Sequence, residues 1–154
     1  MDTTVQQRPS LSIRRQYAAP PEKVWKALIT PAALKLWMGP GDGHVPIAEV
    51  DARVGGSYRI VMVKADGEEH DVRGVYREVN PPKKLVYTWA WKSTPERESL
   101  VTVELRPKDG GTELTLTHSQ FADEAARDGH EKGWNVCLAR LELYVGGNAG
   151  EPRA

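Results

Sequence analysis

The sequence predicts a single α+β domain in which a curved antiparallel sheet wraps around a long C-terminal helix. Two patterns predict this fold. From His44 to Ser119, apolar residues recur at alternate positions between short turns, as in antiparallel strands, and an amphipathic helix pattern follows. The chain of 154 residues has the usual size of one domain. We therefore expect one core within residues 10–146, with residues 1–9 and 147–154 as disordered tails.

Seven strands are expected from the alternation of apolar and polar residues. The first, Ser10–Ala18, fits the pattern only loosely. The others are expected at Ile47–Ala52, Ser57–Val63, His70–Val79, Lys84–Trp91, Ser99–Arg106 and Thr112–Ser119. Asp109-Gly110, between the last two strands, is the most specific turn signal, because a tight hairpin requires positive φ angles that these residues tolerate. The short turns predict an antiparallel meander.

Two short helices are expected between the first strand and the rest of the sheet. Pro21 lies in the first turn of the first helix, where a proline loses no hydrogen bond. Thr30-Pro31 ends this helix and starts a second one, Ala32–Trp37, because the residue before a proline avoids the α region. We expect the two helices to close one end of the groove and to bring Trp25 and Trp37 near its open edge.

The strongest helix pattern follows the last strand. Its apolar residues recur at steps of four, three and four, at Trp134, Leu138, Leu141 and Val145. Gly133 lies early in this helix at a cost of about 1 kcal/mol relative to alanine, which predicts a close approach of the helix backbone to the sheet. Alternatively, the helix begins only there, after a break at Asp128-Gly129. In both cases it is the element long enough to cover the inner face of the sheet.

Large aromatic side chains gather on one face of the predicted sheet. Tyr87, Trp89 and Trp91 are two residues apart on one strand, so they project in the same direction. A curved sheet and a single helix leave more space between them than small side chains fill. These rings therefore predict an aromatic-lined cavity. The alternative is that each ring only fills the core, as tryptophan and tyrosine do in most proteins.

The charge balance argues against two classes of partner. Lysine and arginine together number 21, as do aspartate and glutamate, and no run of five like charges occurs. We therefore expect neither nucleic acid nor a membrane as a partner. The single cysteine, Cys137, has no partner for an intramolecular disulfide, and the start of the chain lacks the apolar run of a signal peptide. These features predict a cytoplasmic protein.

The sequence lacks the familiar motifs of nucleotide binding, zinc proteolysis, serine nucleophiles and paired cysteines, so no cofactor and no metal are expected. Among the four histidines, His118 falls on the inner face of its strand. There its imidazole either orients a polar group of a ligand or has an ordinary hydrogen-bond partner. Glu78 shares the face of Tyr76 and is either an acid in the cavity or a charge at its rim. Together His118 and Glu78 are a candidate acid–base pair without known geometry.

Several short motifs follow one another in a specific order across nearly the whole chain. They are Ala19-Pro20-Pro21-Glu22-Lys23-Val24-Trp25, Thr30-Pro31, Trp37, the runs 74–82, 85–89 and 101–105, Gly110-Gly111-Thr112, the run 114–118, and Gly133-Trp134 with Leu138 and Leu141. Over residues 10–146, their order and spacing resemble the activator of heat-shock protein 90 ATPase homologue-like family of the START-like (SRPBCC) superfamily. The resemblance implies the helix-grip fold, also found in birch-pollen-allergen-like proteins, with a ligand cavity between sheet and helix. The superfamily includes lipid and hormone binders, polyketide cyclases and chaperone activators, so the fold does not name an activity.

The first functional hypothesis is a non-enzymatic domain that binds a small hydrophobic or aromatic molecule in this cavity. The candidate ligand-binding residues are Trp37, Tyr58, Tyr76, Tyr87, Trp89, Trp91, His118, Trp134 and Leu138. One alternative is a stress-response interaction domain that activates the ATPase of the heat-shock protein 90 chaperone, with the chaperone as its partner. The other is a cyclase- or hydrolase-type enzyme acting on an aromatic substrate. We expect the chain to be a monomer or a homodimer.

Overall fold

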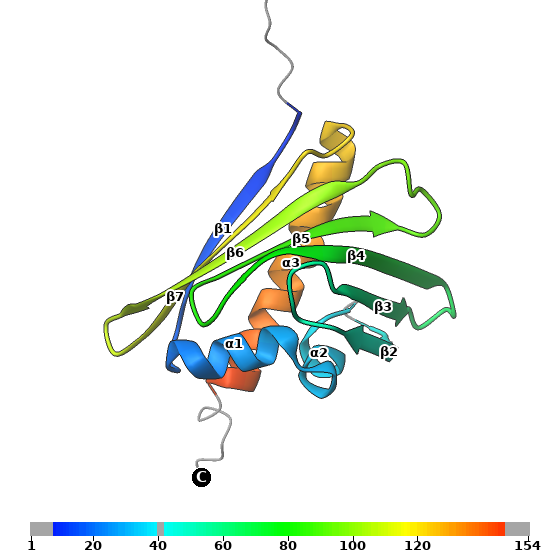
Figure 1. The fold of residues 1–154 in the computed structure, drawn as a ribbon. Coiled ribbons are helices and arrows are strands. Elements are labelled where there is room, and N and C mark those ends of the chain that lie inside the picture. Colours follow the sequence, from blue (N-terminus) through cyan, green and yellow to red (C-terminus); the bar gives the residue numbers. More distant parts are fainter. Residues whose placement is uncertain (1–7, 40–41, 147–154) are drawn as a thin grey trace, which may run out of the picture.

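The fold is one curled antiparallel sheet that wraps around a long helix (Figure 1). The computed structural model describes residues 8–39 and 42–146. The strands are β1 (Leu11–Tyr17), β2 (His44–Val50), β3 (Ser57–Val63), β4 (Glu69–Asn80), β5 (Lys84–Trp91), β6 (Ser99–Lys108) and β7 (Gly111–Ser119). They lie in the order β1-β7-β6-β5-β4-β3-β2. From β2 to β7 each strand pairs with the next one along the chain, which confirms the predicted meander, and β1 joins the sheet beside β7.

The two short helices lie together at one end of the sheet (Figure 1). They are α1 (Pro21–Ile29) and α2 (Pro31–Trp37), separated by Thr30 in an extended conformation, as expected for a residue before proline. Trp25 and Trp37 were expected near the open edge of the groove, and this expectation is wrong. Both are buried in the core, where the Trp37 Nε1–H group donates to the carbonyl oxygen of Ala27 at 2.8 Å. An indole with its one polar group satisfied inside the protein is stable there without water.

The β6–β7 hairpin has the tight turn that the sequence predicts. Asp109 and Gly110 have φ angles of 51° and 80°, so both central residues are left-handed. This geometry matches the right-handed twist of the two strands and brings Lys108 opposite Gly111. The turn thereby sets the register that places the inner faces of β6 and β7 side by side.

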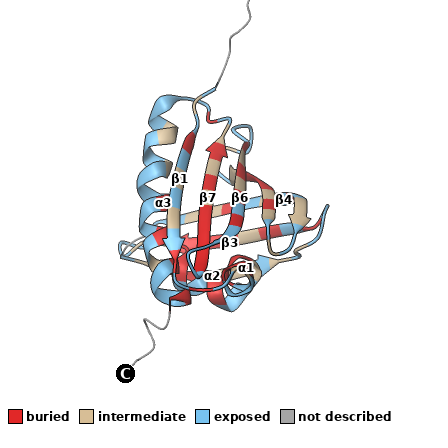
Figure 2. Cartoon of the chain, turned by 90° about the vertical axis from the view of Figure 1, so that its left-hand side faces the viewer, coloured by how far each residue is buried: buried red, intermediate tan, exposed pale blue. Residues whose placement is uncertain are grey.

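The hydrophobic core lies between the inner face of the sheet and α3 (Glu124–Val145), as the burial in Figure 2 shows. Val101, Val103 and Leu105 of β6 are buried together with Leu114 and Leu116 of β7, as strand alternation predicts. The helix is tied to the first strand as well, because the Tyr17 hydroxyl donates to the carbonyl oxygen of Leu138 at 2.9 Å. The side of α3 that faces away from the sheet is exposed.

The structure corrects two expectations about α3. The helix begins at Glu124, well before Gly133, and runs through Gly129 without a break. Asp123 caps it, accepting a hydrogen bond from the Ala126 amide at 2.8 Å, which is a common start signal. Gly133 does not approach the sheet closely. A Cβ atom built on Gly133 would meet no atom within 4 Å outside the helix backbone and its chain neighbours.

A further correction concerns Glu78, which does not share the face of Tyr76. The β4–β5 register shifts between Tyr76, opposite Tyr87, and Glu78, opposite Val86. The extra residue of this β-bulge turns Glu78 outward. There its carboxylate lies 3.7 Å from the Lys84 ammonium group, and 46% of the side chain is exposed.

Most of the two predicted tails, at 1–9 and 147–154, falls outside the described residues. Arg8 and Pro9 are the exception. The Pro9 carbonyl oxygen accepts a hydrogen bond from the Phe121 amide at 3.1 Å, and Arg8 donates to the carbonyl oxygen of Gln120 at 3.3 Å. These two residues therefore lie against the segment that leads into α3.

Candidate functional site

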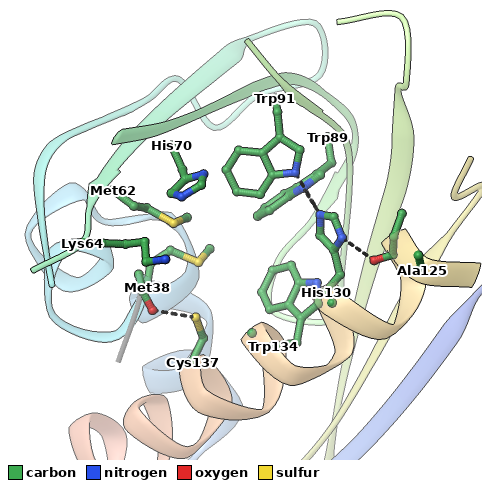
Figure 3. Close-up of a pocket in the computed structure, with 14 residues that line it drawn as sticks. Met38, Met62, Lys64, His70, Trp89, Trp91, Ala125, His130, Trp134 and Cys137 are labelled. Carbon is green, nitrogen blue, oxygen red and sulfur yellow. Dashed lines mark hydrogen bonds between the residues drawn. The ribbon is translucent and has the colours of Figure 1, made fainter. Parts of the chain in front are cut away.

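A cavity of about 410 Å³ lies between α3 and the inner faces of β3, β4 and β5 (Figure 3). It is lined by Met38, Gly39, Met62, Lys64, His70, Trp89, Trp91, Ala125, Ala126, Gly129, His130, Gly133, Trp134 and Cys137. Its size falls in the range of about 300–1,000 Å³ that is usual for small-molecule sites. The indoles of Trp89 and Trp91 form one side, and the thioethers of Met38 and Met62 lie opposite them (Figure 3).

The cavity exists because α3 presents small side chains to it. Ala125, Gly129 and Gly133 follow one another at steps of four residues, so they lie on one face of the helix. A Cβ atom at Gly129 or at Gly133 would meet no neighbouring atom within 4 Å. The volume that a leucine or phenylalanine would occupy at these positions is therefore left open. Glycine inside a helix costs about 1 kcal/mol relative to alanine, so the open space has a price in stability.

His130 fixes the two indoles of β5. Its Nδ1 atom lies 2.7 Å from the carbonyl oxygen of Ala126, which can only accept, so Nδ1 carries the proton. Nε2 is then the acceptor for the indole N–H groups of Trp91, at 2.9 Å, and Trp89, at 3.3 Å. Burial lowers the pKa of His130 below its usual value. The neutral ring holds both indoles in place at the wall of the cavity.

His118 does the same for the third indole. Its Nδ1 atom accepts a hydrogen bond from Trp134 Nε1 at 2.9 Å, and its Nε2 atom donates to the Ser99 hydroxyl at 2.7 Å. Ser99 in turn donates to the carbonyl oxygen of Trp89 at 3.2 Å. Burial lowers the pKa of His118 to about 2, and the neighbouring His130 contributes to the shift. Of the two readings of His118, the structure gives the one with ordinary hydrogen-bond partners.

The predicted ligand-binding residues fall into three groups. Trp89, Trp91 and Trp134 line the cavity. Trp37, Tyr58, Tyr76 and Tyr87 surround a separate void of only about 20 Å³, between the sheet and the short helices. His118 and Leu138 are fully buried and line neither space. A role for these last six residues in ligand binding stays a prediction.

The tyrosines form a packed cluster. Their ring centroids lie 5.2–5.8 Å apart, and the Tyr58 hydroxyl donates to the carbonyl oxygen of Thr88 at 2.6 Å. Burial raises the pKa of the Tyr58, Tyr76 and Tyr87 hydroxyls well above the usual value. The three phenols are therefore neutral, and they fill the core beside the cavity.

Several cavity residues were not predicted from the sequence, although strand alternation could have identified some of them. Tyr58 was assigned to the site, so Met62 and Lys64, four and six residues further on, belong to the same face. His70 pairs with Met62 across the β3–β4 hairpin. His130 lies one helical turn before Trp134 and so shares its face of the helix, but it was not assigned to the site.

The candidate acid–base pair does not assemble. Glu78 is on the outer face beside Lys84, whereas His118 is buried with both ring nitrogens engaged. Among the described residues, no group of three or more His, Cys, Asp or Glu side chains is placed to hold a metal ion. In the same part of the chain, no helix has both the length and the apolar character needed to cross a bilayer.

Comparison with known proteins decides the family. The family model described as Activator of Hsp90 ATPase homolog 1-like protein matches residues 18–146, which is most of the chain. The chain belongs to this family. A comparison with curated proteins found no significant match.

Solved structures of bacterial proteins share the fold of this family member along nearly their whole length. A protein from Chromobacterium violaceum is 29% identical, with a TM-score of 0.83 over 89% of this chain and 97% of that one. The AHSA1 protein from Silicibacter pomeroyi is 31% identical, with a TM-score of 0.79 over 88% and 96% of the two chains. A protein from Rhodobacter sphaeroides is 28% identical, with a TM-score of 0.77 over 88% and 90%. The helix-grip fold of the family is therefore the fold of this chain.

Proposed function

We propose that this protein binds a small hydrophobic or aromatic molecule in the cavity under α3, without chemically changing it. The observation that carries the proposal is the arrangement of the indole side chains that line the cavity. Three indoles line it, and each has its N–H group bonded to a histidine of the protein. The indoles therefore present ring carbon atoms rather than unsatisfied polar atoms, and such a surface favours an apolar guest.

The rigidity of this wall supports binding as well. Each indole has one donor, and an acceptor in the wall fixes the position of each ring before any ligand arrives. A preorganised site does not have to order these side chains on binding, so more of the interaction free energy is available as affinity. Met38 and Met62, on the opposite side, have flexible thioether chains that adapt to the shape of a guest.

Gly133→Leu tests the proposal by filling the cavity. Gly133 lines the cavity and no atom lies within 4 Å of the added Cβ position, so we expect the leucine side chain to occupy part of the cavity. The control is Glu131→Leu, which adds the same side chain at an exposed position of α3 outside the cavity lining.

The measurement is a screen of lipids and aromatic metabolites by tryptophan fluorescence, because Trp89, Trp91 and Trp134 all line the cavity. We expect hits that quench the wild-type protein and Glu131→Leu equally, and that lose their effect on Gly133→Leu. Hits that bind Gly133→Leu as tightly as wild type would place the ligand elsewhere and contradict the proposal. A screen in which no compound quenches the fluorescence of the wild-type protein would contradict the proposal as well.

The other functions considered from the sequence stay predictions. The description of the family names an activator of the Hsp90 ATPase, and the ATPase rate of the chaperone with and without this protein would test that interaction. A cyclase or hydrolase activity would require a reacting pair of side chains in the cavity. The pair predicted for this role, His118 with Glu78, does not meet there.

A further inference from the structure

The cavity has few hydrogen-bond donors left for a ligand. The indole N–H groups of Trp89 and Trp91 donate to His130, and that of Trp134 donates to His118. The Nδ1–H group of His130 donates to the Ala126 carbonyl. The Cys137 thiol donates to the carbonyl oxygen of Gly39 at 3.5 Å. Each of these polar groups is therefore already engaged within the protein.

Two side chains of the lining differ from this pattern, Lys64 and His70. Both belong to the β3–β4 hairpin, and Figure 3 shows them on the same side of the cavity, away from His130. Lys64 follows Met62 on the inner face of the hairpin and, among the residues that the structure describes, is the one Lys, Arg, Asp or Glu that lines the cavity. Its side chain is 40% exposed. An ammonium group has three donors and no acceptor, so what it offers a ligand is a positive charge and hydrogen bonds.

The present partner of Lys64 leaves this capacity largely unused. Glu68 lies 3.4 Å from the Lys64 ammonium and 3.7 Å from His70 Nε2, and it does not line the cavity. All three side chains are about half exposed, and such ion pairs contribute little to stability. An anionic group inside the cavity would compete with Glu68 for the ammonium group, which lines the cavity whereas Glu68 does not.

We propose that the ligand is an amphipathic acid, with an apolar body against the indoles and a carboxylate bound by Lys64 at the β3–β4 end of the cavity. This inference rests on the proposed binding function and adds the charge and orientation of the guest. A carboxylate suits this site because it is an acceptor only, and the remaining donors lie at one end. An ammonium group is instead repelled by the charge of Lys64, and His130 Nε2 already receives two N–H groups.

The test compares three charge states of one scaffold: 2-naphthoate, 2-naphthamide and 2-naphthylmethylamine. The alkyl series decanoate, decanamide and decylamine distinguishes an aromatic acid from a fatty acid as the source of the carboxylate. Binding is followed by calorimetry and by the indole N–H resonances of the ¹⁵N-labelled protein, up to millimolar ligand. We expect the acid to bind roughly fivefold more tightly than the amide in at least one series, and the amine to bind most weakly.

Lys64→Met keeps the apolar stem and removes the charge. It should bring the affinities of acid and amide within roughly twofold of each other, whereas Glu68→Gln should tighten binding of the acid roughly twofold by removing its competitor. The matched control is Lys84→Gln, since Lys84 has a similar exposure of 38% and a similar ion pair with Glu78 but lies outside the cavity lining. It should leave both affinities unchanged.

The outcomes separate this inference from the function on which it rests. Amides that bind as tightly as the acids, or a preference for the acid that survives Lys64→Met, would overturn the inference while the cavity remained a ligand site. If none of the six compounds bound, the inference and the proposed function would fail together.

Discussion

Two neutral histidines organise the cavity wall at the level of single side chains. His130 receives the indole N–H groups of Trp89 and Trp91, and His118 receives that of Trp134. A protonated imidazole has no acceptor, so the arrangement requires both rings to be neutral. Burial meets this requirement, because it lowers the pKa of both histidines. The contacts that align the indoles thus depend on the protonation state of these two imidazoles.

Replacing His118 by leucine should lower the free energy of unfolding by about 2 kcal/mol. The substitution keeps an apolar side chain of similar size but leaves the buried N–H group of Trp134 without an acceptor, and an unsatisfied buried donor costs about 1–3 kcal/mol. Urea denaturation followed by circular dichroism measures the change. His70→Leu, at a half-exposed histidine, is the control and should change stability by about 0.5 kcal/mol or less. Equal effects of the two substitutions would contradict the role given to His118.

Strand alternation predicted the inner faces of β5, β6 and β7 correctly, but it did not predict which of the inner residues line the cavity. Tyr87, Trp89 and Trp91 all project inward from β5, yet Tyr87 is packed against Tyr58 and Tyr76. The difference lies in what faces each ring. The start of β5 lies near the small void that Leu28 and Leu34 of the short helices also line, whereas its end faces the glycines and alanines of α3. That pairing is tertiary, and no local pattern in β5 encodes it.

Among the elements, α3 shows how a local signal was misread. Its second half was predicted from the apolar stripe of Trp134, Leu138 and Leu141, whereas Gly129 and Gly133 were interpreted as a break or as a close contact. Neither interpretation holds, because these glycines face empty space. An apolar stripe identifies a helix that packs against a core, and α3 packs in this way only along part of its length. Where α3 borders the cavity, glycine and alanine residues lie on its inner side, so the spacing of large apolar residues that identifies a helix is absent there.

Gly133→Ala should stabilise the protein by about 1 kcal/mol. Alanine has the higher helix propensity, and its methyl group meets no atom within 4 Å in the cavity. The midpoint of urea denaturation should rise, with the slope of the transition unchanged. A fall in stability would mean that the backbone at Gly133 is closer to its neighbours than the structure shows.

Gly110→Ala should have the opposite effect, although the space around its Cβ position is equally empty. Gly110 has a φ of 80° in the β6–β7 turn, and an alanine in the left-handed region costs about 1–2 kcal/mol. The same denaturation experiment should therefore show a lower midpoint for Gly110→Ala and a higher one for Gly133→Ala. Changes of the same sign would contradict the argument that backbone conformation, and not packing, distinguishes the two positions.

For the molecule as a whole, the order of the strands was predictable and the volume inside them was not. Each turn of the meander is local, and Asp109-Gly110 illustrates how a two-residue signal sets the pairing of two long strands. The cavity depends on the curvature of the whole sheet and on residues from α3, from three strands and from the segment after α2. These elements are distant in sequence, so the aromatic residues of β5 predicted that a cavity exists but not its volume or its full lining.

The free energy of unfolding should decrease when the solution is acidified below about pH 7, which is well above the pH at which carboxylates become protonated. The pKa of His118 is near 6.5 in the unfolded chain and about 2 in the folded protein, so between these values the unfolded state binds an extra proton and acid favours it. The slope is about 1.4 kcal/mol per pH unit, and His118 alone should remove about 2 kcal/mol between about pH 7 and about pH 5. His130, whose pKa is also lowered, should add to this loss.

Ion pairs make a separate contribution at lower pH. Arg59 and Arg73 beside Asp71, and Arg106 beside Glu113, hold the pKa of these carboxyls below its usual value, so their stabilisation is lost only in more acidic solution. Urea denaturation at steps from about pH 7 to about pH 5 therefore isolates the histidines, and His118→Leu should reduce the fall by about 2 kcal/mol. The ring-proton NMR signals of His118 in the folded protein should meanwhile show no titration in this range. If they titrated near pH 6.5, the neutral histidine on which the position of Trp134 depends would not exist.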